Sequence, residues 1–121
     1  ATSTGGAGAP LGRTTAACAS CGAGQLSTVD GDRTLAAGVE LIATPGHTPG
    51  HQSVLLTGDD PVLFTGDLLV HPVQLVDPSL AYGFDDDVDL ARASRQRRLG
   101  GHEGVLATAH LTEPFLRWPA G

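Results

Sequence analysis

The segment TPGHTPGH, from Thr44 to His51, constrains the fold more than any other part of this sequence. Its two prolines and two glycines cannot continue a helix or a paired strand, so the segment is predicted to be a loop. It follows residues 39–44, whose apolar pattern predicts a strand. Glycine and proline beside His47 fix the geometry of such a loop and allow close approach of the backbone. We therefore expect His47 to be held rigidly at the end of a strand.

Two further strand ends carry residues of the same chemical kind. Asp67 follows a predicted strand over residues 62–65, and His110 follows another over residues 105–108. Taken alone, a strand-end His is more often a surface residue, and an Asp after a Gly is more often a turn former. Imidazole and carboxylate are, however, the ligand types that Zn, Fe and Mn prefer. Together and in this order, the three features indicate a metal-binding fold with His47, Asp67 and His110 as candidate ligands.

The rest of the pattern predicts a mixed α/β domain over residues 26–121, preceded by a flexible Gly/Ala-rich segment over residues 1–25. Further strands are expected at residues 26–29 and 33–36, as a hairpin around Asp30-Gly31, and at residues 53–57. Pro72 and Pro78 predict an irregular stretch over residues 67–82. One main helix is expected over residues 88–99, ended by Gly100-Gly101, and residues 105–108 are expected to form the last strand.

The charged residues around this helix have plain structural interpretations. Asp85, Asp86 and Asp87 precede it, where carboxylates cap free amides and complement the helix dipole, and a metal site there is a distant alternative. The basic cluster is interpreted as a solvated helix face in preference to a phosphate site; it consists of Arg92, Arg95, Arg97 and Arg98. His102, in a Gly-flanked loop after the helix, is interpreted as a solvated residue.

Charge and hydropathy exclude several classes of partner. The net charge of −6 argues against nucleic acid and against an anionic membrane surface. No apolar run approaches the roughly 20 residues that span a bilayer, and residues 1–25 lack the pattern of a signal peptide, so a cytoplasmic location is expected. Cys18 and Cys21 have no second Cys pair with which to complete a zinc site; we interpret them as incidental, with redox or metal roles left open.

The strings TPGHTPGHQSVLL, VLFTGDLLVHPVQ and LATAHLTEPF resemble the metallo-β-lactamase superfamily, and the resemblance runs over residues 26–118. It is closest to lactonase-like and organophosphate-hydrolase-like members. It implies an αββα sandwich with two metal ions. His47 would bind the first metal, Asp67 would bridge both ions and orient the nucleophile, and His110 would bind the second. His51 would neighbour the site without being a ligand, and His71 would line the substrate pocket.

The same family carries an HxHxDH motif upstream, and this sequence has no His before His47. Four of the family's seven metal ligands are therefore absent from this sequence. The resemblance implies the carboxy-terminal half of the sandwich: a mixed sheet with one main helix and one uncovered face. In the intact family a metal-activated water hydrolyses ester, lactone or phosphoester bonds of small molecules.

Three interpretations stay open, and with them the question whether the chain is an enzyme. The first is a truncated hydrolase, impaired or dependent on the amino-terminal half. The second is a minimal hydrolase in which His47, Asp67 and His110 share one divalent metal, zinc in preference to Mn or Fe. The third is a noncatalytic half-fold that acts as a dimerisation or binding module. An uncovered apolar sheet face would favour a homo-oligomer or docking of the amino-terminal half.

Overall fold

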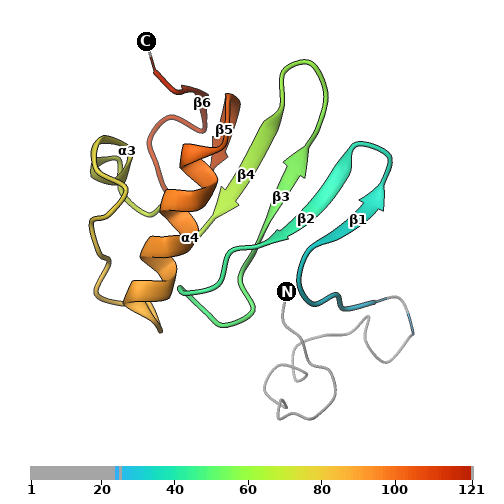
Figure 1. The fold of residues 1–121 in the computed structure, drawn as a ribbon, viewed down its shortest axis with the longest axis horizontal. Helices are drawn as coiled ribbons and strands as arrows, with labels where there is room; N and C mark the ends of the chain where they lie inside the picture. The colour runs from blue at the N-terminus through green and yellow to red at the C-terminus, as the bar shows by residue number, and fades with distance from the viewer. Residues whose placement is uncertain (1–23, 25, 121) are drawn as a thin grey trace.

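In the computed structural model, which describes residue 24 and residues 26–120, a six-stranded sheet packs against one long helix (Figure 1). The elements are β1 (Arg33–Ala36), β2 (Val39–Ala43), β3 (Gln52–Leu56), β4 (Val62–Gly66), α3 (Val73–Val76), α4 (Val88–Gly100), β5 (Gly104–Thr108) and β6 (Phe115–Trp118). The mixed α/β architecture with one main helix is as the sequence predicts.

The strands follow each other across the sheet in the order of the chain, β1-β2-β3-β4-β5-β6. Every neighbouring pair is antiparallel except β4 and β5, which are parallel and are joined through α4. As a result β2, β4 and β5 all run in the same direction. Their carboxyl ends, and the loops that follow them, therefore lie along one edge of the sheet.

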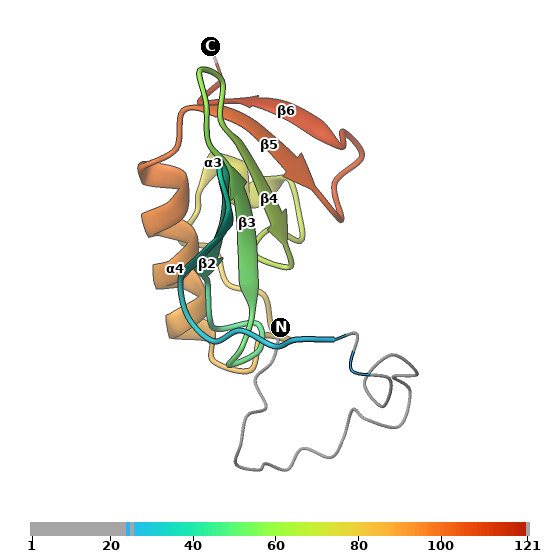
Figure 2. The same ribbon diagram turned by 90° about the vertical axis from the view of Figure 1, so that its right-hand side faces the viewer.

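Helix α4 covers one face of the sheet (Figure 2), and the core beneath it consists of leucines. Leu63 of β4 pairs with Leu106 of β5, and both are almost completely buried. They form the centre of the core with Leu69 and with Leu99 of α4. Burying one such side chain contributes about 1.5–3 kcal/mol, so these leucines fix the helix on the sheet.

The opposite face of the sheet carries apolar side chains that remain exposed. Phe64 of β4, Ala107 of β5 and Phe115 of β6 lie side by side in the strand register. Phe64 is 41% exposed and Phe115 is 65% exposed. This is the uncovered apolar face that the sequence predicts.

The main helix begins and ends close to the predicted residues. Asp87 caps it, because its carboxylate accepts the amide of Leu90 at 3.0 Å. Arg97 and Arg98 lie in the last turn, where positive charge is favourable. The helix continues to Gly100, and Gly101 is its C-cap.

Three predicted elements were wrong or missed. β1 does not pair with residues 26–29, which are not in a strand; it pairs with β2 across a turn at Gly38, whose φ is 79°. Residues 67–82 were predicted to contain no helix, but they include the short helix α3, and Pro72 is its N-cap. β5 is not the last strand, since β6 pairs with it along the edge.

The predicted flexible segment over residues 1–25 lies outside the described residues, apart from Gly24, and so do Cys18 and Cys21. In the part of the chain that is described, neither helix has the length and apolar character needed to cross a membrane.

Candidate metal centre

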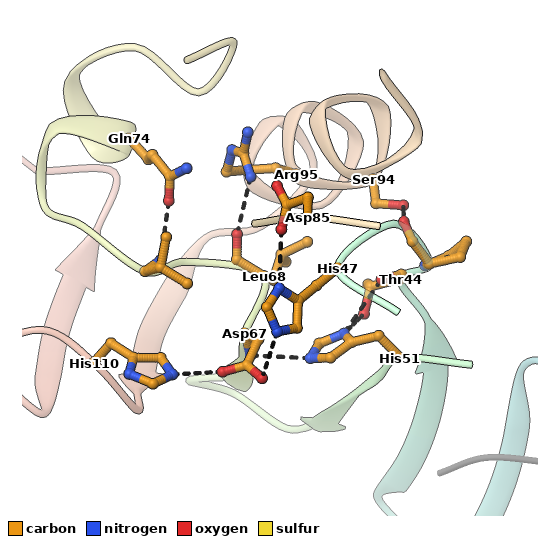
Figure 3. A network of polar contacts seen from close by, with 12 residues as sticks. Thr44, His47, His51, Asp67, Leu68, Gln74, Asp85, Ser94, Arg95 and His110 are labelled. Carbon is orange, nitrogen blue, oxygen red and sulfur yellow. Dashed lines mark hydrogen bonds and ion pairs between the residues drawn. The ribbon is translucent and has the colours of Figure 1, made fainter. Parts of the chain in front are cut away.

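The imidazoles of His47 and His110 both contact the carboxylate of Asp67 (Figure 3). Nε2 of His47 lies 3.2 Å from Oδ2 of Asp67, and Nε2 of His110 lies 2.5 Å from Oδ1. The three residues follow β2, β4 and β5, whose carboxyl ends share one edge of the sheet. The structure thus brings together the three residues that the sequence singles out; their role as metal ligands stays a prediction.

The loop that carries His47 is pinned to the main helix. Ser94 of α4 donates a hydrogen bond from its hydroxyl to the carbonyl of Pro45 at 2.8 Å. Gly46 has a φ of 139°, and a Cβ at this position would lie 2.2 Å from the backbone of Ala91. Only glycine satisfies both the backbone angle and the close approach. The Pro-Gly sequence before His47 is therefore needed to seat the loop on α4.

His47 is held from two further directions. Its Nδ1 lies 2.9 Å from Oδ1 of Asp85, whose side chain is only 2% exposed. The ring of Tyr82 stacks on the imidazole with centroids 6.2 Å apart. These contacts aim the other nitrogen, Nε2, at Asp67.

The environment of Asp67 favours its ionised form. Partial burial alone would raise the pKa of this carboxyl, but the hydrogen bond from His110 and the nearby His47, His110 and His51 outweigh it. The pKa of Asp67 is consequently held below its usual value, and the carboxylate is negatively charged at neutral pH.

His51 neighbours the site through the backbone, as the resemblance implies. Its Nε2 accepts the amide N–H of Asp67 at 2.9 Å, and its Nδ1 lies 2.8 Å from the hydroxyl of Thr44. Burial lowers the pKa of His51, and Asp67 and the carbonyl of Thr44 oppose this only in part. A neutral imidazole is required here, because Nε2 can accept the Asp67 amide only when it carries no proton.

The other two histidines differ in their positions. His71 is exposed and its Nδ1 accepts the amide of Val73 at the start of α3, at 3.0 Å. Its side chain bonds to neither His47, Asp67 nor His110, and its predicted place in a substrate pocket stays a prediction. The interpretation of His102 as a solvated residue was wrong: it is 8% exposed, and its Nε2 lies 2.9 Å from the carbonyl oxygen of Val105.

Comparison with known families fits this geometry. A sequence model of the Metallo-beta-lactamase superfamily matches residues 22–110, which is well over half of the chain. The chain belongs to this superfamily. Its predicted family and its partial α/β fold are thereby confirmed.

Curated metallo-β-lactamase relatives include N-acyl homoserine lactonases from Bacillus. One from Bacillus sp is 36% identical over 73 residues, and one from Bacillus cereus is 34% identical over 73 residues. Each match covers 59% of this chain and 29% of the relative. The chain therefore spans less than a third of the length of these relatives.

Solved structures of similar fold include lactone hydrolases. An N-acyl homoserine lactone hydrolase, with the product N-hexanoyl-L-homoserine at its catalytic metal centre, matches with a TM-score of 0.60 and 27% identity. This match covers 69% of the present chain and 35% of that one. AidC, a dizinc quorum-quenching lactonase, matches with a TM-score of 0.66 over 80% of this chain and 36% of its own, at 24% identity, and so shows the fold alone.

The donor set of this superfamily member fits a divalent ion, although the side chains lie too close to one another to hold one as they stand. No three His, Cys, Asp or Glu side chains in the described residues are arranged around a metal-sized space. Each imidazole instead contacts a separate oxygen of Asp67 directly. Two imidazole nitrogens and one carboxylate are nevertheless a ligand set that catalytic zinc uses.

The sequence analysis did not predict the positions of two residues near the site, Asp85 and Arg95. Asp85, taken as part of a helix start, contacts His47 instead. Arg95, taken as part of a solvated face, is 1% exposed. Its guanidinium donates to the carbonyls of Pro78 at 2.8 Å, Leu68 at 3.3 Å and Leu80 at 2.6 Å. Arg95 thus fixes the segment that directly follows Asp67.

A hollow of about 330 Å³ borders the site on the exposed face of the sheet. Its lining includes Gly66 and Ala109, the residues that precede Asp67 and His110. Phe64 and Phe115 line the remainder, together with Ala107, Thr108 and Pro114. The site therefore opens beside an apolar surface.

Proposed function

We propose that this chain supplies the carboxy-terminal ligands of a metal-dependent hydrolase that opens lactones or related esters. The observation that carries the proposal is the Asp67 carboxylate, which contacts His47 on one oxygen and His110 on the other. Membership of the metallo-β-lactamase superfamily supports hydrolysis, and the lactonase relatives support a lactone as the substrate class. Full activity is proposed to need the further ligands that an HxHxDH motif supplies.

Each residue has a definite task in this proposal. His47 and His110 would each offer an imidazole nitrogen to the ion, and Asp67 would offer its carboxylate. A divalent ion held by these residues would supply Lewis-acid chemistry, polarising a scissile carbonyl and lowering the pKa of water toward about 7. His51 holds the backbone of Asp67 in place, and the hollow between Phe64 and Phe115 accommodates an apolar part of the substrate.

Zinc is the proposed metal, with Mn and Fe as alternatives of the same ligand preference. AidC, a dizinc lactonase of similar fold, supports the choice of zinc. We propose that the present chain alone takes up a single ion, because it provides two imidazoles and one carboxylate at one point. Binding would replace the direct contacts between the imidazoles and Asp67.

Elemental analysis of the purified chain after incubation with zinc tests this proposal. Wild-type protein is expected to retain zinc, and His47→Ala and Asp67→Asn are expected to lose it. Asp60→Asn is the matched control, because Asp60 is an exposed carboxylate on the turn before β4, bonded to Arg117. Zinc-dependent opening of an N-acyl homoserine lactone, abolished by a chelator, would support the substrate class. Negligible zinc in all four proteins would refute the single-ion site.

A noncatalytic binding module is the second candidate function. The exposure of Phe115 and Phe64 on one sheet face favours it, because soluble monomers rarely leave contiguous apolar surface open. A stable oligomer that forms without metal and shows no lactone hydrolysis would support this candidate over the first.

A further inference from the structure

We propose that Tyr82 and Phe84 form an aromatic strip beside the candidate metal centre, and that this strip binds the acyl chain of the substrate and sets its preferred length. The inference deepens the proposed function and rests on it, because it assigns the chain of a lactone substrate to a further part of the same site. Both residues are thereby assigned to substrate specificity.

The aromatic strip begins at the candidate metal centre. The ring of Tyr82 stacks on the imidazole of His47, with centroids 6.2 Å apart and an interplanar angle of 27°. The ring of Phe84 continues from Tyr82, with centroids 5.5 Å apart and an interplanar angle of 55°. His47 in turn contacts the carboxylate of Asp67. The two aromatic rings therefore form one apolar surface that is continuous with the site.

The ring of Phe84 is left in water. Phe84 is 82% exposed, whereas the next residue, Asp85, is 9% exposed. The turn thus buries a carboxylate and exposes a phenyl ring, which is the reverse of the usual preference. Isolated apolar side chains are common on protein surfaces, but this ring contacts an aromatic neighbour of His47. Covering the ring with an apolar chain would remove apolar surface from water, which is favourable.

Hydrogen bonds on both sides of the strip hold it in place. The buried guanidinium of Arg95 donates to the carbonyl of Leu80, two residues before the strip, at 2.6 Å. The amide of Asp86, two residues after the strip, donates to the carbonyl of His47 at 3.1 Å. A surface that is ordered before its ligand arrives loses little conformational entropy on binding. The strip is therefore suited to recognise a flexible chain.

The charges around the strip favour an uncharged occupant. Three consecutive carboxylates follow Phe84, and those of Asp86 and Asp87 belong to exposed residues. An anionic group on the strip would be repelled by these charges. The substrate class named for the lactonase relatives carries a neutral acyl chain. Such a chain fits both the apolar rings and the acidic surroundings.

The hollow on the exposed face of the sheet borders the site at other residues. Its lining includes Gly66 and Ala109, which directly precede the other two candidate ligands. The strip instead begins at His47. The hollow and the strip can therefore hold different parts of one substrate, and the inference assigns the acyl chain to the strip.

NMR of the full, metal-free chain with ¹³C-labelled tyrosine and phenylalanine rings tests this inference. Tyr82 is the single tyrosine, and Phe84 is one of three phenylalanines, of which the other two line the hollow. The labelled rings thus report on the two surfaces separately. The probes are N-hexanoyl- and N-decanoyl-L-homoserine lactone. The longer chain is expected to shift the signals of Tyr82 and Phe84 and to bind about tenfold more tightly, because it removes more apolar surface from water.

Three variants locate the chain-length dependence. Phe84→Ser is expected to bring the affinities of the two lactones close together, because the chain loses the exposed end of the strip. Phe115→Ser, in the hollow, is expected to keep the difference between them. Val76→Ser is the matched control, because Val76 is a similarly exposed apolar residue, at 86%, on the short helix α3. It is expected to behave as wild type.

Equal affinity of the two lactones for the wild type would overturn the inference. A chain-length dependence that survives Phe84→Ser, or that Phe115→Ser removes, would overturn it as well. Hydrolysis by the zinc-loaded chain separates the inference from the proposed function. If this chain opens neither lactone but the Phe84-dependent binding persists, the proposed function fails and the strip stands as a binding surface. If the wild type and Phe84→Ser open both lactones with the same preference, the proposed function stands and the inference fails.

Discussion

Nε2 of His110 lies 2.5 Å from Oδ1 of Asp67, although the two residues are 43 positions apart in the chain. The intervening residues form α3 and α4, and the parallel pairing of β4 with β5 closes the distance. The shared edge of these two strands is what makes the carboxylate and the imidazole neighbours.

His110→Ala is expected to raise the pKa of Asp67 toward its ordinary value. Burial of Asp67 would remain, while the hydrogen bond that most strongly opposes the effect of burial would be lost. A carboxyl with a lowered pKa stabilises the fold above its unfolded pKa and loses that contribution as pH falls. The variant should therefore lose less stability on acidification than the wild type does. Carboxyl-carbon NMR titration gives the pKa directly, with His71→Ala as the control; an unchanged Asp67 pKa would contradict the contact.

His51 is expected to make stability depend on pH from about the ordinary histidine value of 6.5 downward. Its pKa is lowered in the folded state, so the unfolded chain binds the proton first. Its contribution is complete above pH 6.5 and is lost as pH falls through the window between the two pKa values. Urea unfolding across this range should show a slope that His51→Gln reduces. Equal slopes in both proteins would refute a neutral His51 in the fold.

Gly46→Ala is expected to destabilise the fold by about 3 kcal/mol. The added Cβ would overlap the backbone of Ala91, and the φ of 139° adds strain. Gly58→Ala is the matched control, because Gly58 has a similar φ of 143° with no atom within 4 Å of the added group. The control should cost only about 1 kcal/mol. Urea midpoints measure the difference, and equal losses would show that the loop does not rest on α4.

Arg95→Met is expected to destabilise the fold by about 2–4 kcal/mol, because three carbonyl groups lose a buried donor. Arg97→Met, two positions along the same helix, removes an exposed arginine and should change stability little. Arg95→Lys should not restore the loss, since an ammonium lacks the planar fork that reaches several acceptors. Denaturant unfolding distinguishes the three variants; a similar effect at Arg97 would argue against the buried role.

Phe115→Glu is expected to weaken any self-association of the chain. Phe115 lies next to Ala107 and Phe64 on the exposed sheet face, where a charge opposes burial against a second copy. Sedimentation velocity over a range of concentrations measures the effect. Val76→Glu is the control, since Val76 is 86% exposed on α3 and not on the sheet. Association that is equal in both variants would place the contact elsewhere.

The sequence was sufficient to predict the three strand-end residues of the site. Pro45 and Gly46 end a strand by elementary backbone restrictions, and apolar runs before Asp67 and His110 mark the other two strands. The sequence did not predict the edge strand β6, because a strand of four residues is too short to show a period. It also did not predict the hairpin turn at Gly38. The Asp-Gly dipeptide before β1 is the stronger local turn signal, but pairing across the sheet overrode it.

The buried polar residues show a different limit. Arg95 stands four residues from Ala91 and four from Leu99, both buried, so the helical period places all three on one face. That signal was present, but arginine is rarely buried unless it is paired, and its carbonyl partners lie in an irregular segment that no period predicts. Asp85 likewise fits a helix start in sequence, and only the folded chain shows that it turns to His47.

The order of the strands has a consequence for how the chain folds. All neighbouring strands in the sheet except β4 and β5 form antiparallel hairpins. The contacts within a hairpin close only a short loop, so they are expected to form quickly. The exception is the parallel pair β4 and β5, which must wait for α4 to dock. The rate of refolding is therefore expected to be limited by this single crossover. Mutations that slow refolding should lie mainly where Leu99 contacts Leu63 and Leu106.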